Sequence, residues 1–353
     1  MSIGPLGNNL IFLISQPRAG STLTQRILAS HPKVHTVSEP WLMLHPLYAR
    51  RREGITSEYI HRHAHTALEH FLEHAGGEDL YFEALRRMYS YLYDQSLIAS
   101  GKSVFVDKTP RYYLILPELV RTFPEARFIL LVRHPLAVLS SMVRTWAPDG
   151  KLFHLERWKK DLFEAPLRLV EGRSLIEERG AVLHFEEMLA DPLGQIRALC
   201  PKIGLNFVPE MINYGSGTLP TWKFGDAEQV YCHQRPEAAN ADRWLEDATD
   251  PQMWRILNDY FDALGPQTLS TLGYDPERCR KQLEKLRPAR WRSCLTFSLT
   301  YLCDPGSSRK RKLIWFVRQL RRRGLIQALR RSIVVAFKRI IHGRPDGAVD
   351  LHL

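Results

Sequence analysis

The chain has 353 residues, of which 44% are apolar and 25% are charged, as in a globular protein with room for one sizeable α/β domain and an appendage. Its five cysteines are far apart and form no C-x-x-C pair, which argues against a zinc ribbon or a disulfide framework and favours a reducing compartment. The net charge of +11 arises at the C-terminus, because residues 280–344 hold 19 Lys and Arg against two acidic residues.

The sequence shows no recognisable targeting or membrane-spanning segment. Its first ten residues contain no basic stretch followed by a long apolar one, and the apolar run at 10–14 has the length of a strand. We therefore expect no signal peptide and a cytoplasmic location. The longest apolar run near the C-terminus, residues 332–337, ends at Lys338 and is too short to span a bilayer.

Five short apolar runs, separated by helical patterns, predict the strands of one sheet. They are residues 10–14, 33–37, 103–107, 127–132 and 181–185. Such alternation is typical of an α/β fold, in which a parallel sheet is covered by helices on both faces. Since ligands of these sheets bind at the carboxyl ends of the strands, the loops after Ile14, Val106 and Val132 are expected to form the site.

The loop after the first run, QPRAGST at residues 16–22, combines the parts of an anion site. A strand, a glycine turn and a helix start would direct backbone N–H groups and the positive end of a helix dipole to one point. Gly20 would let the backbone approach a ligand closely. Ser21 and Thr22 would add hydroxyl donors, and Arg18 would add a charged fork for paired anionic oxygens. The alternative is an ordinary strand-to-helix turn with Ser21 or Thr22 as the N-cap.

The fourth run repeats this layout in RFILLVRHPLAVLSS, residues 127–141. Arg133 follows the strand, a His-Pro break comes next, and Ser141 lies two turns along the predicted helix. An arginine and a hydroxyl so placed could hold a second phosphate. The alternative is that Arg133 pairs with a carboxylate and that Ser141 is only tolerated in the helix. Two anion sites on one sheet suit a nucleotide with phosphates on both sides of its ribose.

These two segments resemble motifs of the sulfotransferases that use 3′-phosphoadenosine-5′-phosphosulfate (PAPS). QPRAGST is similar to their 5′-phosphosulfate loop, and LVRHPLAVLSS is similar to their 3′-phosphate motif, including the eight-residue step from Arg133 to Ser141. The likeness is greatest to the branch that contains the protein-tyrosine sulfotransferases and bacterial relatives. In that branch the loop runs on through a helix and a His-Pro turn to an acidic residue, which is Glu39 here.

Two further segments resemble the same branch. DKTP at residues 107–110 is similar to its Lys-x-Pro segment, and HFEEMLADP at 184–192 is similar to its Tyr-Glu-x-Leu segment, with Phe185 in place of the usual tyrosine. The resemblance covers about residues 9–275 and does not reach the basic tail.

The resemblance implies a P-loop-like fold and in-line transfer of a sulfuryl group from PAPS to a hydroxyl or an amine. The implied donor-binding residues are Arg18, Ala19, Gly20, Ser21, Thr22, Arg133, Ser141 and Phe185. Arg18 and Lys108 would also stabilise charge that develops on the leaving phosphate and on the sulfuryl oxygens. No metal is implied, and the sequence contains no H-E-x-x-H or paired-carboxylate metal motif.

Glu39 is the candidate general base, because an acceptor hydroxyl must lose its proton as it attacks. It would lie at a strand end opposite the loop of Arg18. Many sulfotransferases use a histidine for this step, so His35 and His45 stay open as alternatives. A structural role of Glu39, as an N-cap or a salt-bridge acid before Pro40, is the other alternative.

We expect a sulfotransferase domain at residues 1–280 and a basic amphipathic helical extension at 281–353. Within the domain, residues 41–100 are predicted to form a helical insertion on the acceptor side, whose clustered histidines indicate a solvated or acceptor-facing helix surface rather than a metal site. Residues 309–341 place apolar residues on helical faces with Arg and Lys between them, which is typical of helices on anionic membranes or acidic partners. We expect this segment to attach the protein peripherally to the inner face of the membrane, unless it packs on the domain.

The sequence leaves the acceptor class open among lipid, glycan, peptide and small metabolite, and we expect no nucleic-acid partner. Two other functions also stay open. One is a P-loop-like nucleotide kinase, against which the absence of the G-x-x-x-x-G-K-[S/T] pattern counts. The other is a non-catalytic protein that binds a membrane or a nucleic acid through its basic tail.

Overall fold

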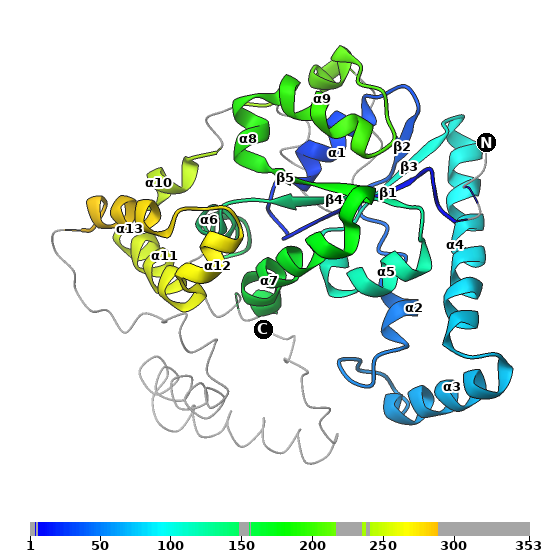
Figure 1. The fold of residues 1–353 in the computed structure, drawn as a ribbon. Helices are drawn as coiled ribbons and strands as arrows, with labels where there is room; N and C mark the ends of the chain where they lie inside the picture. Colours follow the sequence, from blue (N-terminus) through cyan, green and yellow to red (C-terminus); the bar gives the residue numbers. More distant parts are fainter. Residues whose placement is uncertain are drawn as a thin grey trace, which may run out of the picture.

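The structure, a computed structural model, describes residues 4, 6–147, 155, 157–216, 235–237 and 241–288. One parallel sheet forms its centre (Figure 1). Its strands are β1 Leu10–Ser15, β2 Val34–Thr36, β3 Val104–Lys108, β4 Arg127–Val132 and β5 Gly180–His184. They lie in the order β2-β3-β1-β4-β5. Each of the five predicted runs is confirmed as a strand, and no strand end differs from its prediction by more than one residue.

Helices fill most of the chain between and after the strands. They are α1 Ser21–Ala29, α2 Leu44–Tyr48, α3 His61–Ala75, α4 Glu78–Ser100, α5 Leu116–Thr122, α6 Pro135–Trp146, α7 Lys159–Ile176, α8 Phe185–Ala190, α9 Pro192–Lys202, α10 Arg243–Asp247, α11 Pro251–Leu264, α12 Pro266–Thr271 and α13 Pro276–Lys285. The 3-10 turns are η1 Pro110–Leu114, η3 Glu177–Arg179, η4 Pro209–Ile212 and η5 Tyr214–Ser216. Helices α11 and α13 begin with proline after Asp250 and Asp275, whose side chains accept N–H bonds of the first turn, as strong start signals do.

The side chains of β1 explain why both faces of the sheet are covered. Successive side chains of a strand point to opposite faces, and on β1 both sets are apolar. Phe12 and its alternate neighbours pack in one core with α4, α5 and α7, whereas Ile11 and Leu13 pack in a second core with α1, α8 and α9. Figure 1 shows α8 and α9 on one side of the sheet and α5 and α7 on the other. The predicted α/β class, with helices on both faces, is confirmed.

The predicted insertion at 41–100 contains α2, α3 and α4. One side of α4 is buried at helical spacing, and its residues in the first core are Phe82, Leu85, Tyr89, Tyr93 and Leu97. Ion pairs from Arg121 of α5 to Glu78 and Asp79, at 2.6 and 2.7 Å, fix the start of the helix. The insertion is thus packed against the β3 side of the sheet.

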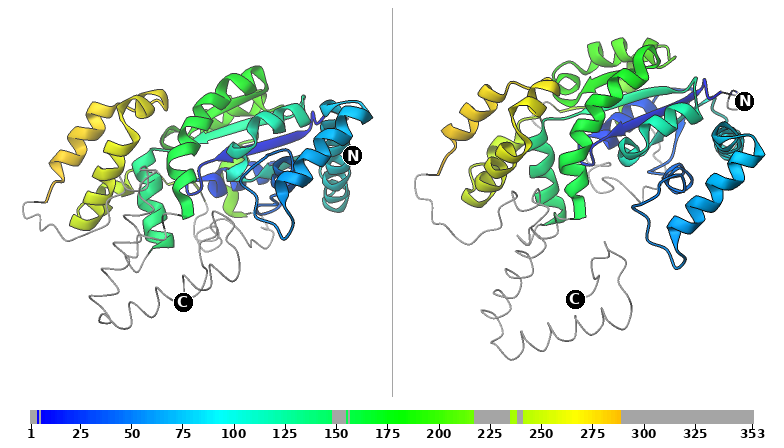
Figure 2. Two further views of the ribbon diagram at one scale, coloured as in Figure 1. Left: turned by 90° about the horizontal axis from the view of Figure 1, so that it is seen from below. Right: turned by 60° about the horizontal axis from the view of Figure 1, so that its bottom comes forward.

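Helices α10 to α13 build a third core with α6. They lie at the opposite end of the molecule from α3 and α4, as the views in Figures 1 and 2 agree. Helix α13 runs through residue 280, where the sequence predicts the domain boundary, and the segment 309–341 lies outside the described residues. Among the helices that the structure describes, none combines the length and the apolar character needed to cross a bilayer.

Candidate active site

The carboxyl ends of the strands meet at one edge of the sheet, since all neighbouring pairs are parallel. One predicted site residue lies at or just after each end, in the order Arg18, Glu39, Lys108, Arg133 and Phe185 along the chain. Strands β1 and β4 are neighbours, so the loops that carry the two arginines are adjacent. This edge therefore gathers the residues that the sequence analysis singles out.

The loop after β1 is a tight turn with Arg18 at its corner. The N–H of Ala19 donates to the carbonyl oxygen of Gln16 at 3.2 Å, and Arg18 has a φ of 68°. Pro17 before a residue of positive φ is the pattern of a type II turn, in which glycine is usual at that place. A non-glycine residue there carries strain of about 1–3 kcal/mol. The Nε of Arg18 donates to the Oγ of Ser141 on α6 at 3.2 Å, so the two predicted phosphate motifs are in direct contact.

Gly20 lies between Arg18 and helix α1, against the ring of Phe185. It has a φ of 95°, and a Cβ atom at this position would lie 2.1 Å from that ring. Both the backbone and the packing therefore require glycine. Helix α1 begins at Ser21 with no side-chain cap from any residue in the described ranges, and its first turn contains no acidic residue. A helix start of this kind favours an anion, because its N–H groups and its dipole both attract negative charge.

Arg133 connects the two loops. Only 8% of the residue is exposed; its Nη1 donates to the carbonyl oxygen of Arg18 at 3.0 Å, and its guanidinium lies 4.5 Å from the centre of the Phe185 ring. Burial, with the positive charges of Arg144 and Arg18, lowers the pKa of Arg133 to about 10. Arg133 is therefore still charged at neutral pH, and a bound anion would relieve the repulsion between it and Arg18.

The turn after β4 is held in place from outside the sheet. The backbone N–H of His134 and the hydroxyl of Tyr274 each donate to Glu186, both at 2.8 Å. The ring of His134 stacks on Trp244 with 5.0 Å between centres. Burial, with the charge of Arg133, lowers the pKa of His134 to about 3, so this histidine is neutral and serves the packing of the turn.

Glu39 and Lys108 form an ion pair at the ends of β2 and β3. The Nζ of Lys108 lies 2.8 Å from the Oε1 of Glu39, and the two side chains are 0% and 11% exposed. The Oε2 of Glu39 accepts the indole N–H of Trp41 at 3.1 Å. The candidate base is thus oriented by two donors and touches the cation that is predicted to stabilise the reaction.

The two histidines kept open as bases have different surroundings. The Nε2 of His35 lies 2.9 Å from the hydroxyl of Ser96 on α4, and its ring packs edge-on against Phe105. Burial lowers the pKa of His35. His45 lies in α2, beyond the segment that carries Glu39. Only Glu39 of the three is in contact with Lys108 among the contacts described.

One charged group near this edge was missed by the sequence analysis. Arg111 donates through Nε and Nη2 to the carboxylate of Asp161, with a shortest distance of 2.7 Å, and its guanidinium lies over the ring of Trp41. The side chain of Asp161 is 4% exposed and also accepts the hydroxyl of Tyr113 at 2.8 Å. Arg111 and Asp161 are 50 residues apart in the chain, so no local pattern could pair them.

Two further groups of side chains make structural contacts. Trp146 and Trp158 stack on each other at 4.5 Å against the third core. In the histidine-rich α3, the ring of His61 bonds to the carbonyl oxygen of Arg51 at 2.6 Å. The described part of the chain contains no group of three or more His, Cys, Asp or Glu side chains arranged to hold a metal ion.

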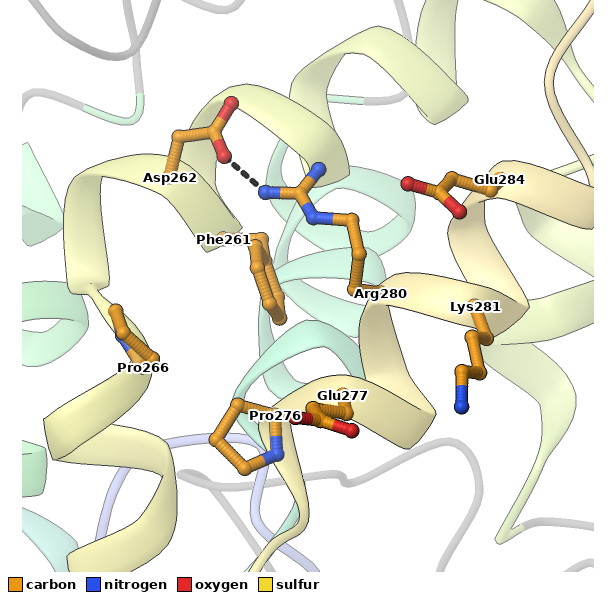
Figure 3. Close-up of a pocket in the computed structure, with 8 residues that line it drawn as sticks. All are labelled: Phe261, Asp262, Pro266, Pro276, Glu277, Arg280, Lys281 and Glu284. Carbon is orange, nitrogen blue, oxygen red and sulfur yellow. Dashed lines mark hydrogen bonds and ion pairs between the residues drawn. The ribbon is translucent and has the colours of Figure 1, made fainter.

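A surface depression of about 450 Å³ lies between α11 and α13 (Figure 3). Phe261 forms its floor, and Arg280 lies over that ring and pairs with Asp262. None of the residues that line it follows a strand end. The depression therefore includes none of the predicted site residues.

Comparison with known proteins identifies the family of this chain. The profile of the sulfotransferase family matches residues 10–209, which include all five strands. The chain belongs to the sulfotransferase family. It is 28% identical over 295 residues to the nodulation protein NoeE of Sinorhizobium fredii, a match that covers 75% of this chain and 66% of NoeE, just under two thirds of that protein's length.

Two further proteins are similar to this sulfotransferase. A Caenorhabditis briggsae protein described as a candidate protein-tyrosine sulfotransferase is 27% identical over 220 residues, which are 58% of this chain and 69% of that protein. Among solved structures, the sulfotransferase domain of the Synechococcus PCC 7002 olefin synthase superposes with a TM-score of 0.51 at 23% identity, over 75% of this chain and 93% of the domain. That likeness supports the predicted P-loop-like sulfotransferase fold.

Proposed function

We propose that this sulfotransferase uses PAPS as the donor and transfers its sulfuryl group to a hydroxyl or an amine by in-line displacement. The observation that carries the proposal is the direct contact of the two phosphate motifs, in which Arg18 bonds to Ser141 and Arg133 bonds to the backbone of Arg18. Two adjacent arginines with a helix start suit a donor that bears anionic groups on both sides of its ribose.

In the proposed complex, each motif holds one end of the nucleotide. The backbone of residues 19–22 and the guanidinium of Arg18 bind the 5′-phosphosulfate, and Arg133 and Ser141 bind the 3′-phosphate. Phe185 packs on Gly20 and beneath Arg133, which keeps both motifs at a fixed separation. A donor preorganised in this way is held for attack without further ordering of the protein.

The proposed reaction needs a base on the acceptor side and cations on the leaving side. The acceptor oxygen loses its proton to Glu39 as it bonds to sulfur, and the bond from sulfur to the 5′-phosphate oxygen breaks. The bisphosphate leaves with the bonding electrons, and Arg18 and Lys108 stabilise the charge that it gains. Glu39 is supported as the base because Lys108 and Trp41 orient its carboxylate.

The acceptor is proposed to enter beside the helical insertion, since Glu39 and Trp41 lead into it along the chain. The relatives are named as a nodulation protein and as a candidate protein-tyrosine sulfotransferase, which leaves peptide, glycan, lipid and small metabolite as acceptor classes. We propose a cytoplasmic enzyme that attaches to the inner face of the membrane through residues 309–341.

Transfer of radioactive sulfur tests the proposed reaction. The purified protein is incubated with PAPS labelled in its sulfuryl group, first with water alone and then with fractionated cell extract. We expect slow release of labelled sulfate and faster labelling of an extract fraction, both lost in Glu39→Gln. A rate of label release equal to that without protein, in every fraction, would refute the proposal.

Liposome flotation tests the proposed membrane attachment. Full-length protein and a variant that ends at Pro288 are mixed with vesicles that contain anionic lipid. We expect only the full-length chain to float, and less of it as salt is raised, because basic helices bind anionic surfaces electrostatically. Equal recovery of both proteins in the unbound fraction would exclude the attachment.

A further inference from the structure

Asp107 is a completely buried acid for which the proposed chemistry has no use. It precedes Lys108 on β3, and because side chains alternate along a strand it lies on the opposite face. Its carboxylate accepts three hydroxyl groups, from Tyr93 at 2.6 Å, Thr109 at 2.8 Å and Tyr112 at 3.0 Å. A buried carboxylate that is so fully bonded fixes the elements that carry its donors.

Two of these three hydroxyls continue the network to the segment after Glu39. The Oγ1 of Thr109 accepts the backbone N–H of Trp41 at 3.4 Å, and the hydroxyl of Tyr112 accepts the backbone N–H of Met43 at 3.1 Å. Tyr93 comes from α4 and makes no such bond with residues 41–43. The carboxylate therefore reaches residues 41–43 along two of its three branches.

The backbone of this segment needs such support. Trp41 has a φ of 55°, a conformation that bulky residues adopt at a cost of about 1–3 kcal/mol, and only when the surrounding structure holds them there. The indole of Trp41 also donates to Glu39. If Trp41 relaxed to an ordinary backbone conformation, that indole would turn away and Glu39 would lose one of its two orienting donors.

We propose that Asp107, through Thr109 and Tyr112, clamps residues 41–43 in the strained conformation that holds Glu39 in position. Asp107 is thus a positioning residue, and the inference rests on the proposed role of Glu39 as base. It assigns a function to the aspartate of the DKTP segment and to two hydroxyls that do not reach the reacting atoms. Burial raises the pKa of Asp107 to about 6 against the lowering effect of its three hydroxyl partners, which is consistent with an ionised clamp at neutral pH.

Three single-hydroxyl variants separate the clamp from mere stability. Thr109→Val and Tyr112→Phe each remove one branch that reaches the segment. Tyr93→Phe is the matched control, because it removes the shortest bond to the same carboxylate but no bond to residues 41–43. Thr109→Ser restores the hydroxyl and serves as the rescue variant. Asp107→Asn is not one of these variants, because it alters all three branches at once and therefore cannot separate one branch from another.

Hydrogen exchange of peptides that cover residues 39–43 is the first readout. We expect Tyr112→Phe to speed exchange about three- to tenfold, the value of one buried hydrogen bond. Thr109→Val should speed exchange less, because the bond from Trp41 to Thr109 is longer than the bond from Met43 to Tyr112. Tyr93→Phe and Thr109→Ser should leave exchange of these peptides unchanged. Equal acceleration in Tyr93→Phe and Tyr112→Phe, or acceleration in none of the variants, would overturn the clamp.

Sulfate release from labelled PAPS, with water as the acceptor, is the second readout. We expect kcat to fall at least tenfold in Tyr112→Phe, while the Kd of 3′-phosphoadenosine 5′-phosphate stays within twofold and shows that the donor site is folded. Tyr93→Phe should keep its kcat. The pattern of hydrogen exchange tests whether Asp107 holds residues 41–43, whereas the turnover of Glu39→Gln tests whether Glu39 is the base. Failure of one claim is therefore distinguishable from failure of the other.

Discussion

The Nζ of Lys108 lies 2.8 Å from the Oε1 of Glu39, with the lysine side chain completely buried. A buried pair of this kind gains little net stability, because both charges lose their hydration, but removal of one partner is costly. The ion pair orients its two groups, because it places a carboxylate and a cation side by side at the ends of two neighbouring strands. In the proposed reaction these are the group that takes the proton and a group that stabilises the leaving phosphate.

Glu39→Gln should abolish most turnover without loss of the donor site. The amide keeps the shape of the side chain and can still accept from Lys108, but it cannot take a proton, so the rate of sulfuryl transfer should fall about 10²- to 10⁴-fold. The Kd of 3′-phosphoadenosine 5′-phosphate, measured by calorimetry, should change less than threefold. Glu83→Gln, on the exposed side of α4, is the control, and unchanged turnover in Glu39→Gln would place the base elsewhere.

Adjacent serines on α6 provide a matched test of the 3′-phosphate site. Ser141 bonds to Arg18, whereas the hydroxyl of Ser140 bonds to Asp247 on α10. Ser141→Ala should weaken binding of 3′-phosphoadenosine 5′-phosphate by about 1.5–3 kcal/mol, the value of a hydrogen bond to a charged group. Ser140→Ala should lower thermal stability and leave this Kd unchanged. Equal effects of both substitutions on the Kd would remove Ser141 from the site.

Gly20→Ala should damage the site through packing as well as through backbone strain. A methyl group at Gly20 would overlap the ring of Phe185, whereas Gly101 has a similar positive φ with nothing within 4 Å of its position. Gly101→Ala should therefore cost about 1–2 kcal/mol of unfolding free energy, and Gly20→Ala should cost more and reduce nucleotide affinity as Phe185 moves. Equal losses of unfolding free energy in Gly20→Ala and Gly101→Ala, measured with urea, together with unchanged nucleotide affinity in Gly20→Ala, would contradict the close packing of Gly20 on Phe185.

The pH dependence of stability should report the burial of Asp107. Burial raises its pKa to about 6, above its ordinary value of 3.8, so the folded chain binds this proton more tightly than the unfolded chain does. The contribution of this group to stability is then fully present below pH 3.8 and is lost as pH rises through 6. The unfolding free energy of wild type minus that of Asp107→Asn should fall by up to about 3 kcal/mol between pH 4 and 7.

Urea unfolding of both proteins at four pH values across this range would check the prediction. Other carboxylates titrate in both proteins and cancel in the difference. A difference that is constant, or that grows with pH, would show that Asp107 is not a buried acid with a raised pKa.

The sheet could be predicted because its strands are apolar on both faces and end in recognisable loops. The placement of the Arg18 and Arg133 loops at one edge followed once the sheet was predicted to be parallel, but their contact depends on β1 and β4 being neighbours. The contact of Glu39 with Lys108 could not be foreseen, because it depends on β2 and β3 being neighbours. Nothing in the sequence marks the positive φ of Trp41, which arises from its tertiary surroundings.

The central claim is that Arg18 and Arg133 bind opposite ends of one doubly phosphorylated adenosine. Calorimetric titration of wild type, Arg133→Ala and Arg127→Ala with 3′-phosphoadenosine 5′-phosphate and with ATP tests it most directly, since Arg127 lies at the other end of β4. The bisphosphate should bind at least 100-fold more tightly than ATP, and Arg133→Ala alone should weaken it about 10- to 100-fold, the value of a charged hydrogen bond. Equal affinity for both nucleotides, or equal affinity in the three proteins, would contradict the account.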